Sequence, residues 1–385
     1  PGNATCTQCH SPQAFDTPAH TLHPAPGGPA CVDCHMPATT YMGVDSRRDH
    51  SFRVPRPDLA HLDGAPDACT GCHKDKPAAW AAAEIERAFG PDRKGYQAWG
   101  PTFHAARGGR QDAGALLSQV VQDKATPAIA RATAAAGLAG HLGPEVEPAL
   151  RSALSDPDPK VRGAAAEALI GAPAAVRTRL LMPLVGDPSR IVRLKAGRAL
   201  AGIDLAALDP ATRTRVQAAF DGYVVSQEAN LDRPEALANL GAFHEALGDT
   251  ARAEQDYRAA LARSSVFVPA WLNLADLYRR SGREAEAAAV LDQAWKANRD
   301  DASVAHAIGL SKVRQGAPAD ALEWLRRASE GAPDNPRYAF VYAVALHDTG
   351  NPARARAVLD AAIARHPQDA LLQQKIGRAS CRERV

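Results

Sequence analysis

The chain changes its pattern of apolar and polar positions about a fifth of the way along. Residues 1–68 carry frequent proline and glycine and show no sustained apolar period near 3.6 residues, which is typical of loops with short helical turns. The segment 77–90 predicts the first longer helix, with Pro77 near its start and Gly90 at its end. We therefore expect a mainly α protein in which a loop-rich amino-terminal domain, 1–109, precedes helical repeats.

The segment 110–222 contains a first family of internal repeats. Arg131, Arg162 and Arg193 share one repeat position at equal spacing, and the dipeptides Asp156-Pro157 and Asp187-Pro188 share another. A turn dipeptide followed by a helix that carries Val-Arg before small residues and leucine resembles the HEAT repeat of stacked helix pairs. The period is shorter than the roughly 40 residues of HEAT units, so we expect compact HEAT-like units with short first helices.

The segment 223–376 contains a second family of repeats, with a slightly longer period. Glycine recurs at the turn between helices, and alanine recurs at two positions of each second helix. The residues in register are Gly248, Gly282, Gly316 and Gly350, then Ala253, Ala287, Ala321 and Ala355, then Ala260, Ala294, Ala328 and Ala362. This period is that of the tetratricopeptide (TPR) unit, so it predicts four TPR repeats and a terminal helix, which together with the HEAT-like units form an α-solenoid. Such a solenoid commonly docks a protein or peptide, and the alternative is that it only braces the amino-terminal domain.

The net charge, the hydropathy and the two ends of the sequence bear on which classes of protein this chain can belong to. The formal net charge of +2 comes from 45 basic and 43 acidic residues, which indicates neither nucleic-acid nor membrane binding. No apolar run is long enough to predict a membrane span. The chain starts at Pro1, so we expect a missing amino-terminal portion, and we interpret 377–385, with Cys381, as a non-native tail.

Six of the seven cysteines form three Cys-x-x-Cys pairs, and histidine follows each pair at once. The motifs comprise Cys6, Cys9 and His10; Cys31, Cys34 and His35; and Cys69, Cys72 and His73. This spacing is the attachment motif of c-type haem, in which two thiols bind the porphyrin and the adjacent imidazole is the proximal iron ligand. A disulfide scaffold and a zinc site are the alternatives, but zinc needs no histidine directly after each pair. The sequence predicts three covalent haems as a lower bound, and hence a periplasmic or other extracytoplasmic location.

Four further histidines lie in the same region and are candidate distal iron ligands. His23 and His50 are the first choices, followed by His20 and then His61. A second imidazole on each iron closes the site to substrate and suits electron transfer, whereas an open position suits catalysis. A solvated loop histidine is the alternative for each of them.

Arginines are concentrated beside the second motif. Arg47, Arg48, Arg53 and Arg56 are candidates to pair with haem propionates through charge-assisted hydrogen bonds. A solvated basic loop is the alternative interpretation.

The whole order resembles multihaem c-type cytochromes that carry a TPR region. The resemblance runs through "CVDCHMP" (31–37), "YM" (41–42), "RRDHSFRVPRPDL" (47–59) and "ACTGCHKDKPAAWAA" (68–82), and then the solenoid. It implies an exported bacterial protein related in haem packing to the multihaem nitrite reductase and hydroxylamine oxidoreductase group. Members often carry more haem motifs upstream, so further haems and distal ligands can belong to sequence that this chain lacks.

From these features we expect electron transfer through bis-histidine haems, with the solenoid docking a redox partner protein. Reduction of a nitrogen oxyanion or a similar small molecule at an open haem is the rival, so the sequence leaves open whether the protein is an enzyme. A redox-sensing, peptide-binding scaffold is the third hypothesis. All three motifs end in histidine, which is not the distinctive proximal ligand that a reductase would usually have.

Overall fold

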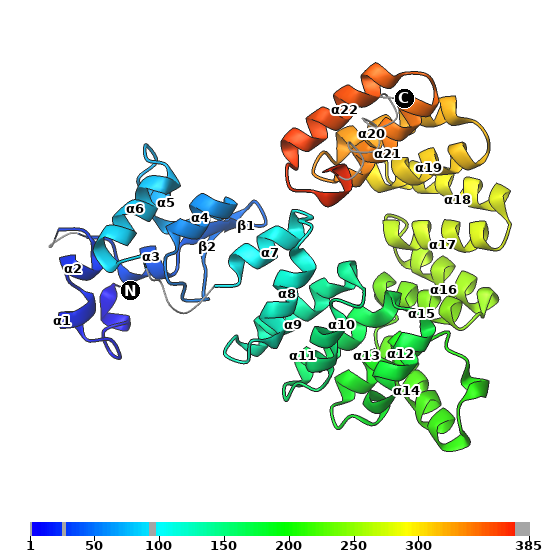
Figure 1. Cartoon of the computed structure of the whole chain (residues 1–385), viewed down its shortest axis with the longest axis horizontal. Coiled ribbons are helices and arrows are strands. Elements are labelled where there is room, and N and C mark those ends of the chain that lie inside the picture. Colours follow the sequence, from blue (N-terminus) through cyan, green and yellow to red (C-terminus); the bar gives the residue numbers. More distant parts are fainter. Residues whose placement is uncertain (1, 25–27, 92–97, 374–385) are drawn as a thin grey trace. The chain divides into compact units, whose positions relative to one another are not determined.

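The computed structural model describes residues 2–24, 28–91 and 98–373, and the chain divides into two compact units, Pro1–His104 and Ala105–Val385. The predicted tail 377–385, including Cys381, lies outside the described residues. Figure 1 shows a mainly helical chain with one small hairpin. The prediction of a mainly α protein is therefore confirmed.

The first unit is built from short elements. Its helices are η1 (Asn3–Thr5), α1 (Pro12–Phe15), α2 (Pro18–Thr21), α3 (Cys31–His35), α4 (Pro57–Asp63), α5 (Ala68–Cys72) and α6 (Ala78–Phe89), and α7 (Gly100–Arg107) crosses into the second unit. Helix α6 ends at Gly90, which has a φ of 81°, and it confirms the helix predicted over 77–90.

An antiparallel hairpin of β1 (Ala38–Tyr41) and β2 (Asp45–Arg48) was not predicted from the sequence. Ala38 pairs with Arg48 and Tyr41 pairs with Asp45, and the tight turn places Met42 and Gly43 at positive φ. All the strand residues are exposed. Without a buried face the strands show no alternation of apolar and polar residues, and alternation is the signal by which a strand is recognised.

The first unit has almost no apolar core of its own. Within its described residues only Pro57, Ala60 and Ala81 are buried. Larger apolar side chains lie at the surface, with Met42, Val44 and Phe52 at 82%, 88% and 67% exposure. A segment of this length would normally bury a much larger share of its apolar surface on folding.

The second unit begins with short helices stacked in pairs. These are α8 (Ala113–Gln122), α9 (Ala128–Gly137), η2 (Leu138–His141), α10 (Glu147–Leu154), α11 (Pro159–Ala168), η3 (Leu169–Gly171), α12 (Ala174–Leu181), η4 (Met182–Gly186), α13 (Arg190–Leu200), η5 (Leu205–Ala207) and α14 (Pro210–Glu228). The repeated arginines lie on α9, α11 and α13, the second helix of each pair. The first helices α10 and α12 are short, at 8 residues each, as the short period predicted.

Four longer helix pairs complete the unit. They are α15 (Pro234–Ala246) with α16 (Thr250–Arg263), α17 (Val268–Arg280) with α18 (Glu284–Ala297), α19 (Ala302–Arg314) with α20 (Pro318–Gly331), and α21 (Pro336–Asp348) with α22 (Pro352–Arg365). The four predicted glycines all lie between the helices of a pair at φ of 73–84°, a conformation that favours glycine.

Small residues let the helices of each long pair approach closely. Ala253, Ala287 and Ala321 are at most 1% exposed. A Cβ at Gly241 would lie 2.6 Å from the Tyr257 ring, and one at Gly309 would lie 2.6 Å from a Leu325 methyl carbon. The repeated small positions therefore set the distance between the packed helices.

Candidate functional site

The second and third cysteine motifs lie on single helical turns. Helix α3 carries Cys31–His35 and α5 carries Ala68–Cys72. Asp67 caps α5 by accepting hydrogen bonds from the backbone N–H groups of Cys69 (2.8 Å) and Thr70 (2.9 Å). Because residues three apart share one face of a helix, each turn presents its two thiols on the same side.

The first motif follows η1 and is also a turn. The His10 N–H donates to the Cys6 carbonyl at 3.0 Å. The Cys31 N–H donates to Asn3 Oδ1 at 2.9 Å, and burial, then the charge of the nearby Cys6, raises the pKa of Cys31. The first two motifs are therefore neighbours in the folded chain.

All six motif cysteines are free thiols, so this structure holds no disulfide among them. Burial, and then the charge of Asp33, raises the pKa of Cys34. Burial raises the pKa of Cys69 to about 11, and the Asp67 carboxylate adds to the shift. A raised pKa keeps a thiol protonated at neutral pH, so neither cysteine resembles an activated thiolate nucleophile.

Two of the candidate distal histidines lie against motif histidines. The ring centroids of His20 and His35 are 6.0 Å apart with planes 12° from parallel, and those of His23 and His73 are 5.8 Å apart. Burial, and then the neighbouring His35, lowers the pKa of His20, which favours its neutral imidazole. The fold thus brings two distal candidates, each from the α2 region, to two different motifs.

Backbone carbonyls hold several of these rings. His23 Nδ1 lies 2.6 Å from the Thr21 carbonyl oxygen, and His35 Nδ1 lies 2.8 Å from the Arg53 carbonyl oxygen. When Nδ1 donates to a carbonyl, Nε2 remains for a metal, which is the usual arrangement of ligating histidines. His50 Nδ1 contacts the Arg48 carbonyl oxygen (2.8 Å), but among the described rings neither His50 nor His61 contacts a motif histidine.

The four candidate arginines are ion-paired with nearby aspartates. Arg48 contacts Asp33 at 2.9 Å, and it also donates to the carbonyl oxygens of Val32 and Met36. The other pairs are Arg47–Asp45 (3.3 Å), Arg53–Asp49 (2.6 Å) and Arg56–Asp58 (2.7 Å). A propionate at these arginines would share them with, or displace, an aspartate.

A ladder of buried ion pairs in the second unit was not predicted from the sequence. Arg131 pairs with Asp156 at 2.8 Å, and Arg162 pairs with Asp187 at 2.8 Å, so each arginine reaches the aspartate of the next repeat. Arg131, Arg162 and Arg193 also donate to carbonyl oxygens at or before the turn that precedes their own helix. The Val-Arg and Asp-Pro positions are therefore two halves of one contact between neighbouring repeats.

Asp156 shows the strength of this contact. Its side chain is fully buried, which disfavours the charged carboxylate. Hydrogen bonds from Arg131, the Asp158 N–H and Lys124 outweigh that burial and lower the pKa of Asp156 to about 2. The carboxylate is therefore ionised throughout the ordinary pH range.

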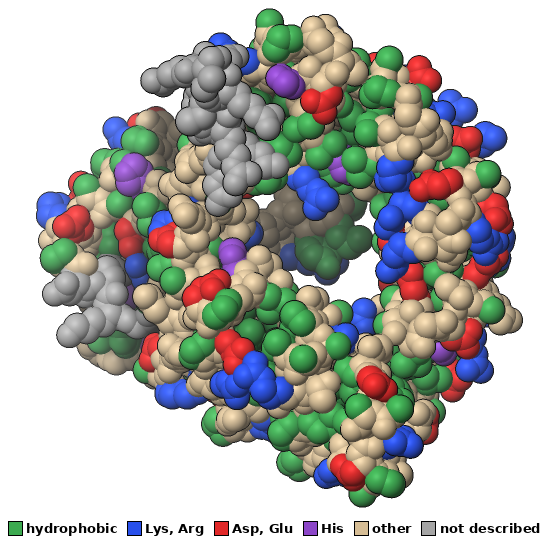
Figure 2. All heavy atoms as spheres, turned by 45° about the vertical axis from the view of Figure 1, so that its right-hand side comes forward, with side chains coloured by type: hydrophobic (Ala, Val, Ile, Leu, Met, Phe, Trp, Pro, Cys, Tyr) green, Lys and Arg blue, Asp and Glu red, His purple; other side chains and the backbone are tan. Residues whose placement is uncertain are grey.

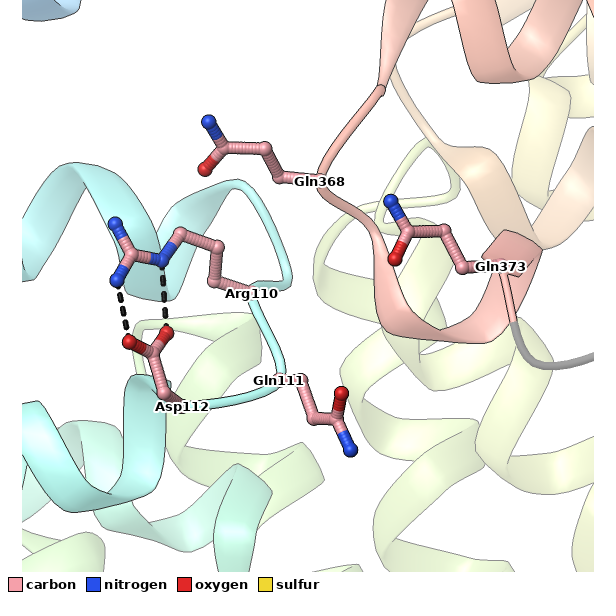
Figure 3. A pocket seen from close by; sticks show the side chains of 5 residues that line it. All are labelled: Arg110, Gln111, Asp112, Gln368 and Gln373. Carbon is pink, nitrogen blue, oxygen red and sulfur yellow. Dashed lines mark hydrogen bonds and ion pairs between the residues drawn. The ribbon is translucent and has the colours of Figure 1, made fainter.

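The last described residues of the second unit lie against its first ones. The Ala370 N–H donates to the Gly109 carbonyl oxygen at 3.0 Å. A shallow hollow of about 580 Å³ beside this contact is lined by Arg110, Gln111, Asp112, Gln368 and Gln373. In Figure 3 the guanidinium of Arg110 is held by Asp112, and the three glutamines come from both sides of the hollow. The lining is polar and open, so it lacks the apolar wall typical of a small-molecule site.

Charge is mixed on the face of the molecule that Figure 2 shows. Figure 2 shows basic and acidic side chains interspersed on the face in view. None of the described helices is both long enough and apolar enough to cross a bilayer. In the described ranges, no group of three or more histidine, cysteine, aspartate or glutamate residues is arranged to hold a metal ion.

Comparison with known families identifies both kinds of repeat. Residues 114–201 match a model described as HEAT repeats, and residues 244–309 and 312–378 match a tetratricopeptide repeat model. The HEAT and TPR repeats predicted from the sequence are confirmed. No curated protein matches the chain.

Solved TPR structures resemble part of the chain. TTC0263, a TPR protein of Thermus thermophilus, is 20% identical, covers 50% of this chain and 100% of its own length, with a TM-score of 0.36. MamA is 18% identical over 41% of this chain and 88% of its own, with a TM-score of 0.33. YrrB, described as a TPR protein with an unusual peptide-binding site, is 16% identical over 54% of this chain and 100% of its own, with a TM-score of 0.33.

These findings correct the predicted function. Electron transfer through bis-histidine haems, and its rival of nitrogen-oxyanion reduction, are overturned. The families that match are repeat families, and no metal-binding group is found in the described part of the chain. Binding of a protein partner is the part of the prediction that these matches support. Covalent attachment at the cysteine pairs is tested by neither finding and stays a prediction.

Proposed function

We propose that this chain, which carries HEAT and TPR repeats, is a protein-binding scaffold whose solenoid holds a segment of a partner polypeptide. The observation that supports this most is the succession of helix pairs from α8 to α22, packed through small residues and buried ion pairs. Stacked repeats bury their core between neighbours and leave an extended surface for a ligand. Binding along such a surface needs no catalytic group, and it suits the mixed surface charge.

Selection of peptides on the full chain tests this function. A random displayed peptide library should yield a few convergent sequences that bind saturably. Hydrogen exchange should then show protection of helices between α8 and α22 in the bound state. A library that yields no convergent binder, or binders that protect only the first unit, would contradict the scaffold function.

We also propose that the first unit binds three c-type haems. Cys6 and Cys9, Cys31 and Cys34, and Cys69 and Cys72 would hold them covalently, with His10, His35 and His73 as proximal ligands. The residues present fit such a group. The described residues of the unit form almost no apolar core, and a porphyrin is a large apolar body. Attachment of this kind takes place outside the cytoplasm, so the same proposal places the protein in the periplasm or another extracytoplasmic compartment.

Within this proposal two of the four distal candidates are favoured. His20 and His23 lie beside His35 and His73, and the Nδ1 atoms of His35 and His23 are already engaged by carbonyl oxygens. His50 and His61 are not favoured, because among the described ring contacts neither lies against a motif histidine. Such a group, when bound, would supply a ligated iron, and these side chains would hold it.

Counting haem in the protein tests this cofactor. Protein from a host that matures c-type haem should stain for covalent haem in a denaturing gel, and the pyridine haemochrome should give three haems per chain. A variant with Cys69→Ser and Cys72→Ser should lose one haem and keep two. Protein without covalent haem from a competent host would overturn the proposal.

A further inference from the structure

A cavity of about 400 Å³ lies where the HEAT region meets the TPR region. Helix α14 forms one wall, and helices α15 and α16 form the other. The volume is within the range typical of ligand pockets. All of its lining residues belong to the second unit.

Helix α14 uses one of its faces to pack and leaves the next face open. Phe220 and Tyr223 contact the Phe243 ring with centroids 5.5 and 4.9 Å apart. The open face carries Asp221, Val224, Val225 and Glu228, spaced as i, i+3, i+4 and i+7. Residues at this spacing form one stripe along a helix, so two valines lie between two carboxylates.

The floor of the cavity is apolar. Leu237 and Leu240 on α15 and the more exposed Leu231 add to the two valines. Val225 is 56% exposed, whereas Leu237 and Leu240 are at most 8% exposed. An aliphatic side chain of a ligand would bury Val225 together with the leucines.

The charges on the two walls differ. On the α15–α16 wall, His244 Nδ1 lies 2.6 Å from Asp256 Oδ2; burial raises the pKa of that carboxyl, and His244 and then Arg252 oppose the rise. The α15–α16 wall therefore carries the opposite charges of Asp256 and Arg252 close to each other. On the α14 wall, Asp221 accepts a hydrogen bond from the neutral Gln217 amide at 2.9 Å, and neither Asp221 nor Glu228 has an ion-pair partner among the described residues.

We infer that this seam cavity, defined by the residues of α14, α15 and α16 above, binds an amphipathic basic segment of a partner protein. The segment would present aliphatic side chains between two lysines or arginines. The two carboxylates stand at i and i+7, which is about 10 Å along a helix. A partner helix with basic residues at the same spacing matches both ends of the stripe while its aliphatic residues fill the floor. The inference rests on the scaffold function and names the chemistry of its ligand.

The peptides selected on the full chain test the inference directly. The enriched class should carry two basic residues at i and i+7 with leucine, isoleucine or methionine between them. Val225→Arg should weaken binding of these peptides at least about tenfold by filling the cavity with charge. The exposed Val266→Arg, in the loop before α17, is the matched control and should bind as the wild type does.

A charge-reversal variant distinguishes loss of the proposed ion pairs from a general loss of structure. Glu228→Lys should lose the basic peptides and gain their counterparts in which one lysine is replaced by glutamate. Retained helicity in circular dichroism would establish that each variant folds.

Three other outcomes of these experiments would overturn the inference. Convergent peptides that bind Val225→Arg and Glu228→Lys as tightly as wild type would overturn the seam cavity and leave the scaffold function standing. Enrichment of acidic peptides would overturn the stated chemistry. Dimerisation of the full chain that Val225→Arg abolishes would assign the cavity to a second copy and also overturn the inference.

Discussion

The two units of this chain are stabilised in different ways. In the second unit, leucines and small residues recur at the same repeat positions and are nearly all covered, as with Leu325 and Ala328 at 0% exposure. In the first unit, three small residues are buried in the described part, and the hairpin strands are exposed along their length. The contrast indicates that the repeats supply their own apolar core, whereas the described residues of the first unit bury very little apolar surface.

Limited proteolysis should show the largest difference between the units. In protein made without covalent haem, we expect trypsin to cut within residues 1–104 at least about a hundredfold faster than within α8–α22, because local unfolding of a segment with little buried surface is cheap. Mass spectrometry of the fragments over time measures both rates. Haem-loaded protein is the control and should protect the first unit. Equal cleavage of both units without haem would remove the contrast.

Removing a rung of the arginine–aspartate ladder should be the largest single-residue effect. Asp156→Ala leaves the buried Arg131 without its carboxylate, and we expect a loss of about 3 kcal/mol in the free energy of unfolding. Urea unfolding followed by circular dichroism measures it. Asp45→Ala, which breaks the exposed Arg47 pair of the hairpin, should cost less than about 0.5 kcal/mol. Similar losses for both variants would count against the buried ladder.

Two glycine substitutions should have opposite signs. Gly241→Ala places a Cβ 2.6 Å from the Tyr257 ring, and we expect it to destabilise the second unit by about 2 kcal/mol. Gly163→Ala, within α11, meets only a Lys195 side-chain carbon at 3.4 Å and should stabilise by about 0.5 kcal/mol through helix propensity. Thermal unfolding of both variants measures the difference. A neutral Gly241→Ala would show that the helix crossing is not tight.

The smallest expected effect is a pH dependence in the TPR region. His306 is 8% exposed and stacks on Tyr338 with centroids 4.5 Å apart; burial, and then Arg337, lowers its pKa to about 4. The unfolded histidine binds its proton more readily, so this contribution to stability is complete above about pH 6.5 and is lost as the pH falls toward 4.

Lowering the pH from 7 to 5.5 should reduce the free energy of unfolding by about 1 kcal/mol through His306. His306→Phe keeps the ring stack and should remove that part of the pH dependence in urea unfolding. The exposed His347→Phe is the control and should leave it unchanged. An identical pH dependence in the wild type and His306→Phe would contradict the assignment.

The repeats were largely predictable from the sequence because their physical signals are local. Glycine at positive φ and alanine at helix crossings leave a fixed period, and that period predicted α15–α22. The hairpin Ala38–Tyr41 with Asp45–Arg48 left no such signal, since neither of its faces is buried. The ladder was missed for another reason: Arg131 and Asp156 are distant in sequence, and both residue types are usually exposed, so their pairing shows only in three dimensions.

The candidate site was predictable only in part for the same reason. Each Cys-x-x-Cys-His motif is a local pattern, whereas the choice of neighbours for His20 and His23 depends on how α2 lies against α3 and the α5 region. The sequence favours His23 and His50 over His20 as distal ligands, whereas in the structure His20 lies against His35 and His50 Nδ1 lies at the Arg48 carbonyl oxygen. The prediction of electron transfer for the whole chain was wrong because it followed the haem motifs, which are more specific sequence patterns than the helical repeats.

The arginine–aspartate ladder has a consequence for how such a chain can evolve. Arg131 and Arg162 each pair with the aspartate of the following repeat, and the arginines and aspartates recur with one and the same period. Duplication of one whole period would bring a new arginine and a new aspartate together, and every rung would keep its partner. Insertion of only part of a period would leave a buried arginine or aspartate without its ion-pair partner. The ladder therefore permits the repeat array to lengthen or shorten in whole units and selects against any other change in its length.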